Sequence, residues 1–178
     1  MGRRVFILWG VCIAFTRLLF PDSAAAGGTL ETRYAVITYY RAEDLREFND
    51  ELYMGRLKSR IRKTETLEEE VSAKIDFITE KVMVVLDMFP PKLKFNIVIH
   101  EDVKGVRADF RRLYNIDVKY IAFYSPSRDT VFLSADDAGL RVVAHEIGHV
   151  VAENYFTISP PQRIHEVMAQ YAEQHITD

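Results

Sequence analysis

The sequence predicts an α+β domain built on one small mixed sheet, with an edge hairpin and with helices packed against the sheet. Three features of the chain lead to this prediction. Short segments rich in β-branched and aromatic residues alternate with longer segments of helical periodicity. Two short strands stand close enough together to form a hairpin, and two helical segments end the chain. At 178 residues, 48% of them apolar, the chain suits a single domain.

The first half of this domain is expected to contain one strand and two helices. Residues 33–40 (RYAVITYY) predict a strand, and residues 41–53 predict a polar helix. A longer helix is predicted over residues 66–88, where Thr66 and Glu69 fit a capping box. Its apolar side chains recur at steps of three and four residues: Leu67, Val71, Ile75, Ile78, Val82 and Leu86.

The second half is expected to add three strands and three helices. The predicted strands are residues 94–100, 120–124 and 130–134, and the predicted helices are residues 101–114, 138–155 and 161–176. The five residues between the last two strands are a normal hairpin connection. Each of the two final helices has an apolar stripe that is expected to pack inward. The stripes are Leu140, Val143, Ala144, Ile147 and Val151 in one helix, and Ile164, Val167, Met168, Tyr171 and Ala172 in the other.

Residues 1–26 have the pattern of a secretory signal peptide, so the folded domain is expected to span residues 27–178. A basic start precedes an apolar run that is too short to cross a bilayer, and Ala24-x-Ala26 fits a signal-peptidase cut. The Sec route and the twin-arginine route both fit these residues. We therefore expect an exported protein, periplasmic or secreted, without stable membrane insertion after cleavage. The alternative is an uncleaved N-terminal membrane anchor.

Charge and cysteine content exclude several classes of function. The chain has 23 Lys and Arg against 26 Asp and Glu, which argues against general binding of nucleic acid. The only cysteine, Cys12, lies in the leader. A disulfide framework, a four-cysteine zinc site and an iron–sulfur cluster are therefore excluded. A metal would have to be held by histidine and carboxylate side chains.

The chemically informative segment is His145-Glu146-Ile147-Gly148-His149, inside the first of the two final helices. Two histidines four residues apart share one helix face and rise about 6 Å along the axis, so both imidazoles can reach one Zn²⁺. Glu146 is turned by about 100° from His145 and can take a proton from a water at the open coordination position. The segment predicts a catalytic zinc site with His145 and His149 as ligands and Glu146 as general base. Two surface histidines on an amphipathic helix are the alternative.

A catalytic zinc needs a third protein ligand, and the residues themselves leave several candidates. The metzincin pattern is excluded, because Ala152 and Tyr155 stand where its glycine and third histidine would be. Glu153 lies about 12 Å along the helix axis from His145, which is too far for both to bind one metal. The candidates that remain are on the final helix: His165, Glu166, Glu173 and His175. Glu173 is also a candidate for orienting a ligand histidine.

The motif helix, a short turn with two prolines and residues 166–171 (EVMAQY) together resemble the gluzincin metallopeptidases. The closer likeness is to compact single-domain gluzincins, of the minigluzincin or peptidase MA-like type, and it implies that residues 27–178 form a zincin-like metallopeptidase domain. The resemblance implies that Glu166, in its Glu-x-x-Ala-x-Tyr setting, is the third zinc ligand, and His165 is the second choice. It also implies that the hairpin before the motif helix holds an extended peptide at its edge.

The expected function is hydrolysis of peptide bonds by an exported zinc peptidase, with Zn²⁺ as cofactor and a peptide or protein as substrate. Glu146 would accept the proton of the metal-activated water and deliver it to the leaving amine. One alternative is a zinc-binding structural or regulatory module of gluzincin fold with little or no peptidase activity. Another is a metal-free interaction domain. The sequence predicts no nucleic-acid partner and does not indicate an oligomeric state.

Overall fold

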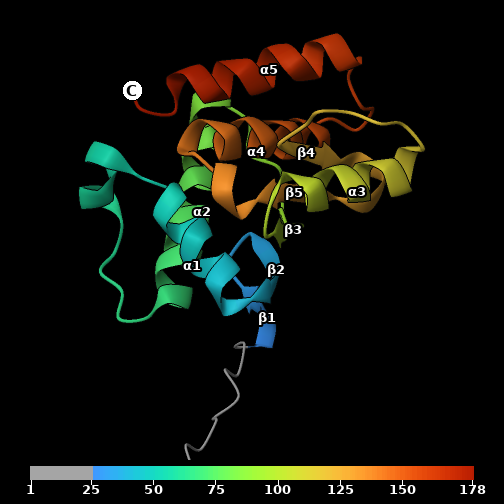
Figure 1. Cartoon of the computed structure of the whole chain (residues 1–178). Coiled ribbons are helices and arrows are strands. Elements are labelled where there is room, and N and C mark those ends of the chain that lie inside the picture. Colours follow the sequence, from blue (N-terminus) through green and yellow to red (C-terminus); the bar gives the residue numbers. More distant parts are fainter. Residues whose placement is uncertain (1–25) are drawn as a thin grey trace, which may run out of the picture.

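A computed structural model of the chain describes residues 26–178, which form one five-stranded mixed sheet in the order β1-β2-β3-β5-β4 (Figure 1). The strands are β1 (Ala26–Glu31), β2 (Ala35–Arg41), β3 (Phe95–His100), β4 (Ala122–Ser125) and β5 (Thr130–Ser134). The three central strands run parallel, whereas β1 and β4 lie antiparallel at the two edges. The predicted α+β class is confirmed.

Five α-helices surround this sheet: α1 (Ala42–Glu51), α2 (Leu67–Leu86), α3 (Val103–Tyr114), α4 (Leu140–Tyr155) and α5 (Gln162–His175). Short 3-10 turns are η1 (Gly55–Arg60), η2 (Pro126–Arg128) and η3 (Ala135–Asp137). Every element predicted after residue 32 is present, with bounds within two residues of the prediction. The capping box is present in part, because Thr66 Oγ1 accepts from the Glu69 N–H at 3.2 Å while the Glu69 carboxylate accepts from the Glu65 N–H.

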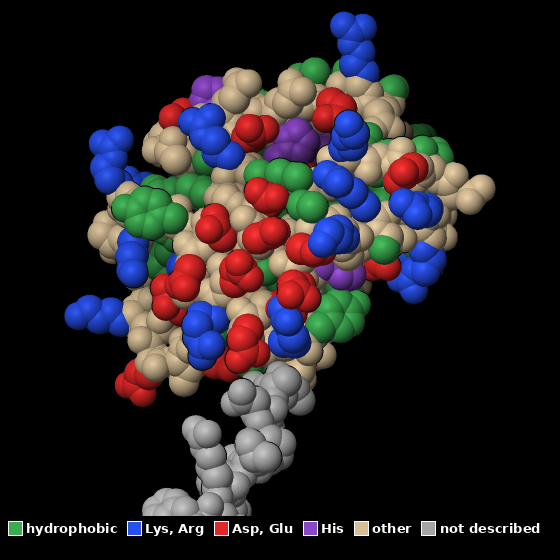
Figure 2. Space-filling model, viewed as in Figure 1, with side chains coloured by type: hydrophobic (Ala, Val, Ile, Leu, Met, Phe, Trp, Pro, Cys, Tyr) green, Lys and Arg blue, Asp and Glu red, His purple; other side chains and the backbone are tan. Residues whose placement is uncertain are grey.

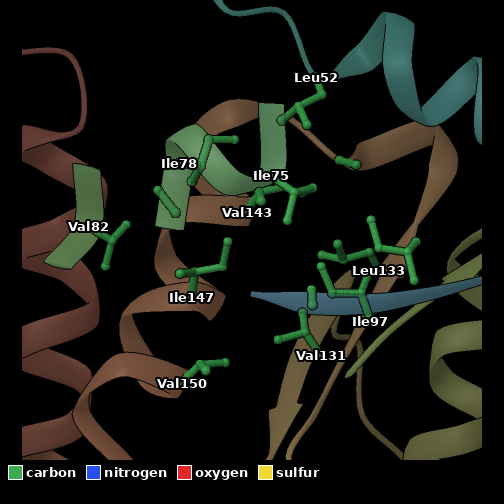
Figure 3. Close-up of a cluster of buried hydrophobic side chains, with 14 of the residues drawn as sticks. Leu52, Ile75, Ile78, Val82, Ile97, Val131, Leu133, Val143, Ile147 and Val150 are labelled. Carbon is green, nitrogen blue, oxygen red and sulfur yellow. The ribbon is translucent and has the colours of Figure 1, made fainter. Parts of the chain in front are cut away.

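The helices divide between the two faces of the sheet. Ile97 and Ile99 of β3 point into the main core with side chains of α2 and α4, whereas Val98 between them points to the other face. On that other face α3 places Val106 and Phe110 against the sheet. Figure 3 shows the main core. It brings together residues of α2 (Ile75, Ile78, Val82), of α4 (Val143, Ile147, Val150) and of the central strands (Ile97, Val131, Leu133).

Strand β1 was not predicted from the sequence. Its residues AGGTLE lack the β-branched and aromatic pattern of a strand. They are held in place by pairing with β2, where Gly28 lies opposite Tyr39. A Cβ atom on Gly27 would clash with the Tyr40 carbonyl oxygen, so the close approach of the two strands requires glycine there. The pairing partner, not the local composition, makes this segment a strand.

The predicted inward stripe of the final helix is wrong for its large side chains and right for Ala172. Ile164, Val167 and Tyr171 are about half exposed, at 47%, 57% and 50%. The buried side chains of α5 are Ala172, the one member of the predicted stripe among them, together with His165 and Ala169. Helix α5 lies outside α4 and α2 and packs on them, away from the strands (Figure 1). Its contact face is therefore made of small residues that allow close helix packing, and its larger apolar side chains face outward.

The predicted signal peptide falls outside the described residues, except for Ala26, which begins β1. Among residues 26–178, no helix combines the length and the apolar character needed to cross a bilayer.

Candidate metal centre

Helix α4 positions the three residues of the His-Glu-x-x-His motif. Its inward stripe is confirmed, since Val143, Ile147 and Val151 are fully buried. The histidines are displayed on the side of α4 that faces α5 and the cleft, with the ring centroids of His145 and His149 5.0 Å apart. One side of the helix therefore anchors it to the core, and the other presents both imidazoles.

Helix α5 brings Glu166 to the two histidines. One carboxylate oxygen of Glu166 lies 3.7 Å from His145 Nε2, and the other lies 3.7 Å from His149 Nε2. Donor atoms of the three residues lie within 4.8 Å of one another, and no other such cluster of His, Cys, Asp and Glu occurs in residues 26–178. Ligands of a tetrahedral zinc at 2.0–2.1 Å stand about 3.4 Å apart, close to the separations seen here. Imidazole and carboxylate are also donors that zinc accepts, so the residues fit the ion.

The close approach of α4 and α5 depends on Gly148, which lies between the two histidines of the motif in sequence. A Cβ atom at Gly148 would meet Ala169 Cα at 2.9 Å and Ala172 Cβ at 3.3 Å. Small residues on both helices therefore bring the two backbones together. Because Glu166 is one turn before Ala169, this contact also carries the Glu166 carboxylate to the imidazoles.

Glu173 orients one of the candidate ligands. Its carboxylate lies 3.0 Å from His145 Nδ1. An Nδ1–H donated to this carboxylate leaves the Nε2 lone pair directed toward Glu166, where a metal would be bound. Helix α5 thus supplies both a candidate ligand, Glu166, and the group that fixes the tautomer of His145, Glu173.

Electrostatics keep His149 in the form that binds metals. Burial lowers the pKa of His149 to about 4, and the neighbouring His145 and His165 act in the same direction. The imidazole is therefore neutral at neutral pH, as a ligand must be.

Glu146 lines the same cleft as the cluster of His145, His149 and Glu166. Its side chain is nearly inaccessible, and burial followed by the charge of Glu166 raises its pKa to about 8. The backbone N–H of Tyr124 acts in the opposite direction by donating to the carboxylate. A carboxyl group with a pKa near neutrality is suited to accept and release a proton, and a cation bound at the neighbouring cluster would lower that pKa further toward the ionised form.

The motif opens into a cleft of about 560 Å³ between the β4 edge, α3 and the α4–α5 connection. Strand β4 is the outermost strand, so its outer side has no strand partner among the described residues. Tyr124 of β4 lines the cleft and donates its hydroxyl to Asp129 at 2.8 Å. The wall near α3 is aromatic and apolar: Phe110, Tyr114, Ile116, Tyr120 and Phe123.

The other candidate ligands do not join the cluster. His165 lines the same cleft, but its Nε2 atom is 3.0 Å from a Glu153 carboxylate oxygen and 3.3 Å from Ser159 Oγ. His175 lies near the chain terminus, paired with Asp178 at 2.6 Å. Of the candidates on α5, Glu166 alone combines with His145 and His149 in the described part of the chain. Glu153 and Ser159 were not expected in the cleft: Glu153 reaches it from α4, one turn after His149, and Ser159 is brought there by the turn between α4 and α5.

Comparison with known proteins gives no match, whether with family models, with curated proteins or with solved structures.

Proposed function

We propose that the protein is a zinc-dependent peptidase of gluzincin type. The observation that carries this proposal is the convergence of His145, His149 and Glu166 from two helices, with the buried carboxyl group of Glu146 on the same cleft. Two imidazoles and one carboxylate leave a fourth coordination position open, which is the arrangement of catalytic rather than structural zinc.

His145, His149 and Glu166 would hold the metal. A zinc ion bound there supplies a water of lowered pKa and polarises the scissile carbonyl. Glu173 keeps the His145 ring in the tautomer that offers Nε2, and burial keeps His149 neutral. Glu146 accepts a proton at its carboxylate and later delivers it to the leaving amine. Its buried position retains that proton between the two events.

The substrate we propose is an extended peptide or unfolded protein segment. Strand β4 offers a free edge beside the motif, and a peptide can pair with such an edge through main-chain hydrogen bonds. This pairing would place a peptide carbonyl over the cluster. Because it uses main-chain groups, it would not require a particular side chain in the substrate. In line with the predicted signal peptide, we propose that the enzyme acts after export.

The proposal is tested by metal analysis and by the Glu146→Gln variant. The purified protein should bind about one equivalent of zinc and cleave an unstructured protein such as casein. Glu146→Gln should retain zinc and lose about 10²–10⁴-fold in kcat, because the proton acceptor is removed while the ligands stay. Equal cleavage by the variant would show that Glu146 is not the base.

Two further outcomes separate the remaining alternatives. Stoichiometric zinc without cleavage by the wild-type protein would favour a structural or regulatory zinc module. Less than about a tenth of an equivalent of zinc after incubation with the metal would contradict both zinc interpretations.

A further inference from the structure

A second hollow of about 530 Å³ lies on the outer side of α3, and it is lined mainly by cationic side chains. Its lining residues are Lys104, Arg107, Ala108, Arg111, Asp117, Val118 and Lys119. Positions 104, 107 and 111 fall on one face of α3. Figure 2 shows Lys and Arg side chains gathered over the α3 side of the molecule, while Asp and Glu dominate the middle of the same view. We call this hollow the basic pocket.

Two of the four cations in the basic pocket form no ion pair with any residue that the structure describes. Arg111 pairs with Asp117 at 2.9 Å, and Lys104 pairs with Asp102 at 3.4 Å. Arg107 and Lys119 form no ion pair within residues 26–178. The chain as a whole carries a net charge of −3, so this excess of positive charge is local.

Arg107 is the residue best placed to receive an anion. Its Nε atom is buried and has no hydrogen-bond partner in the described part of the chain. A guanidinium has five donors in a planar fork that fits a carboxylate through two parallel hydrogen bonds. On one side of the pocket the Asp117 carboxylate accepts a single hydrogen bond from Arg111 at 2.9 Å, which indicates the kind of group that the pocket accepts.

The basic pocket and the catalytic cleft share one wall. Ile116 and Tyr120 line the cleft, whereas residues 117–119, between them in the chain, line the basic pocket. Helix α3 contributes to both, with Phe110 and Tyr114 on the cleft side. An extended chain advances about 3.3 Å per residue, so a peptide leaving the cleft over this wall would reach the pocket within a few residues.

We propose that the basic pocket binds a short acidic segment of a polypeptide and holds it beside the cleft. A long polyanion fits less well, because the pocket is lined by only four cations and the chain as a whole carries a net charge of −3. Binding of the acidic segment is independent of the metal. Its use in selecting substrates with acidic residues a few positions from the scissile bond rests on the proposed function.

The test compares a labelled neutral peptide with the same peptide carrying three aspartates at one end. Binding is measured by fluorescence anisotropy with metal-free protein, so that no cleavage occurs. At about 50 mM salt the acidic peptide should bind about fivefold more tightly, as expected for two or three exposed ion pairs, and the preference should vanish near 500 mM salt. Equal binding of the two peptides at low salt would overturn the proposal.

Variants locate the effect. Arg107→Gln combined with Lys119→Gln should abolish the preference for the acidic peptide. Arg112→Gln should retain it, because Arg112 lies on the same helix but does not line the pocket. Asp117→Asn removes the internal competitor and should strengthen acidic-peptide binding about twofold to threefold. Loss of the preference in Arg112→Gln, or no gain in Asp117→Asn, would contradict the assignment to this pocket.

Other anions are further outcomes of the same assay. Tighter binding of heparin or of vesicles rich in phosphatidylserine than of the acidic peptide would overturn the choice of a polypeptide. A protein that keeps the acidic preference but cleaves no peptide would contradict only the proposed peptidase function. A protein that cleaves neutral and acidic substrates equally and binds both equally would contradict only the basic pocket.

Discussion

Helices α4 and α5 build the candidate metal centre together, but they are held in the fold by different means. Helix α4 buries large apolar side chains, such as Ile147 and Val150, in the main core. Helix α5 packs through Ala169 and Ala172 and leaves Ile164 and Val167 largely exposed. In a helix that packs on the core, the large apolar side chains form the buried face. In a helix that packs closely on another helix, the small residues form the buried face.

The largest expected effect is a difference in the free energy of unfolding between variants in the apolar stripe of α4 and variants in the apolar stripe of α5. Ile147→Ala should lower the free energy of unfolding by about 2–5 kcal/mol, because it leaves a cavity in the core. Ile164→Ala should change it by no more than about 0.5 kcal/mol, since the side chain is half exposed. Urea unfolding of both variants measures the difference. Equal losses of unfolding free energy in the two variants would show that the Ile164 side chain is buried in solution.

The next effect concerns the support that α5 gives to α4 through Glu173. Glu173→Ala should weaken zinc binding about 10–100-fold, because His145 loses the group that fixes its tautomer. The matched control is Glu51→Ala, which removes the same charge from the exposed end of α1. Competition with a chelator of known affinity gives the zinc dissociation constants. Unchanged zinc affinity in Glu173→Ala would mean that the contact does not orient the ligand.

The small-residue contact between the helices can be broken at Gly148. Gly148→Val should destabilise the protein by about 1–3 kcal/mol and weaken zinc binding, because the added carbons force α5 and Glu166 away from α4. Gly139→Ala is the control, since nothing lies within 4 Å of a Cβ atom at that position. Thermal unfolding with and without zinc measures both effects. If Gly148→Val bound zinc as tightly as the wild type, helix spacing would not control the site.

The last effect is a pH dependence that arises from two side chains of α4, Glu146 and His149, in the metal-free protein. Glu146 has a pKa of about 8 when folded and an ordinary value of 4.5, so the folded state binds the extra proton between these values. Stability should therefore fall as pH rises from about 4.5 to 8. His149, with a folded pKa of about 4 and an ordinary value of 6.5, acts oppositely: its contribution falls as pH decreases from about 6.5 to 4.

Chemical unfolding of wild type and Glu146→Gln across this range separates the two groups. The variant should lose the decline above pH 4.5 and keep the decline toward acid that belongs to His149. A wild-type curve that rises steadily to pH 8 would contradict the raised pKa of Glu146.

Much of the secondary structure could be predicted from the sequence because the signals are local. The β-branched run of β2, the periodic apolar residues of α2 and the stripe of α4 each follow from neighbouring residues. The spacing of His145 and His149 places both rings on one helix face wherever that helix lies in the protein. The fold class and the pair of candidate histidine ligands were therefore accessible before the structure.

Other features depend on partners distant in sequence. Strand β1 exists because β2 pairs with it, and the inward face of α5 is selected by Gly148 on another helix. The residues of α5 left four possible third ligands, since periodicity does not say which face meets α4. In the same way the basic pocket joins Arg107 of α3 to Lys119 beyond the helix, a proximity created by the turn of the chain between them.

The sequence by itself determined the α+β elements, the motif helix and the chemistry that two histidines and a glutamate at this spacing can perform. Only the tertiary structure decided that Glu166 completes the cluster, that Glu173 supports His145 and that the cleft adjoins a pocket of positive charge. The physical reason is one of range. Helical and strand periodicity is fixed by backbone geometry within a few residues, whereas the choice of neighbours is made by packing between segments far apart in the chain.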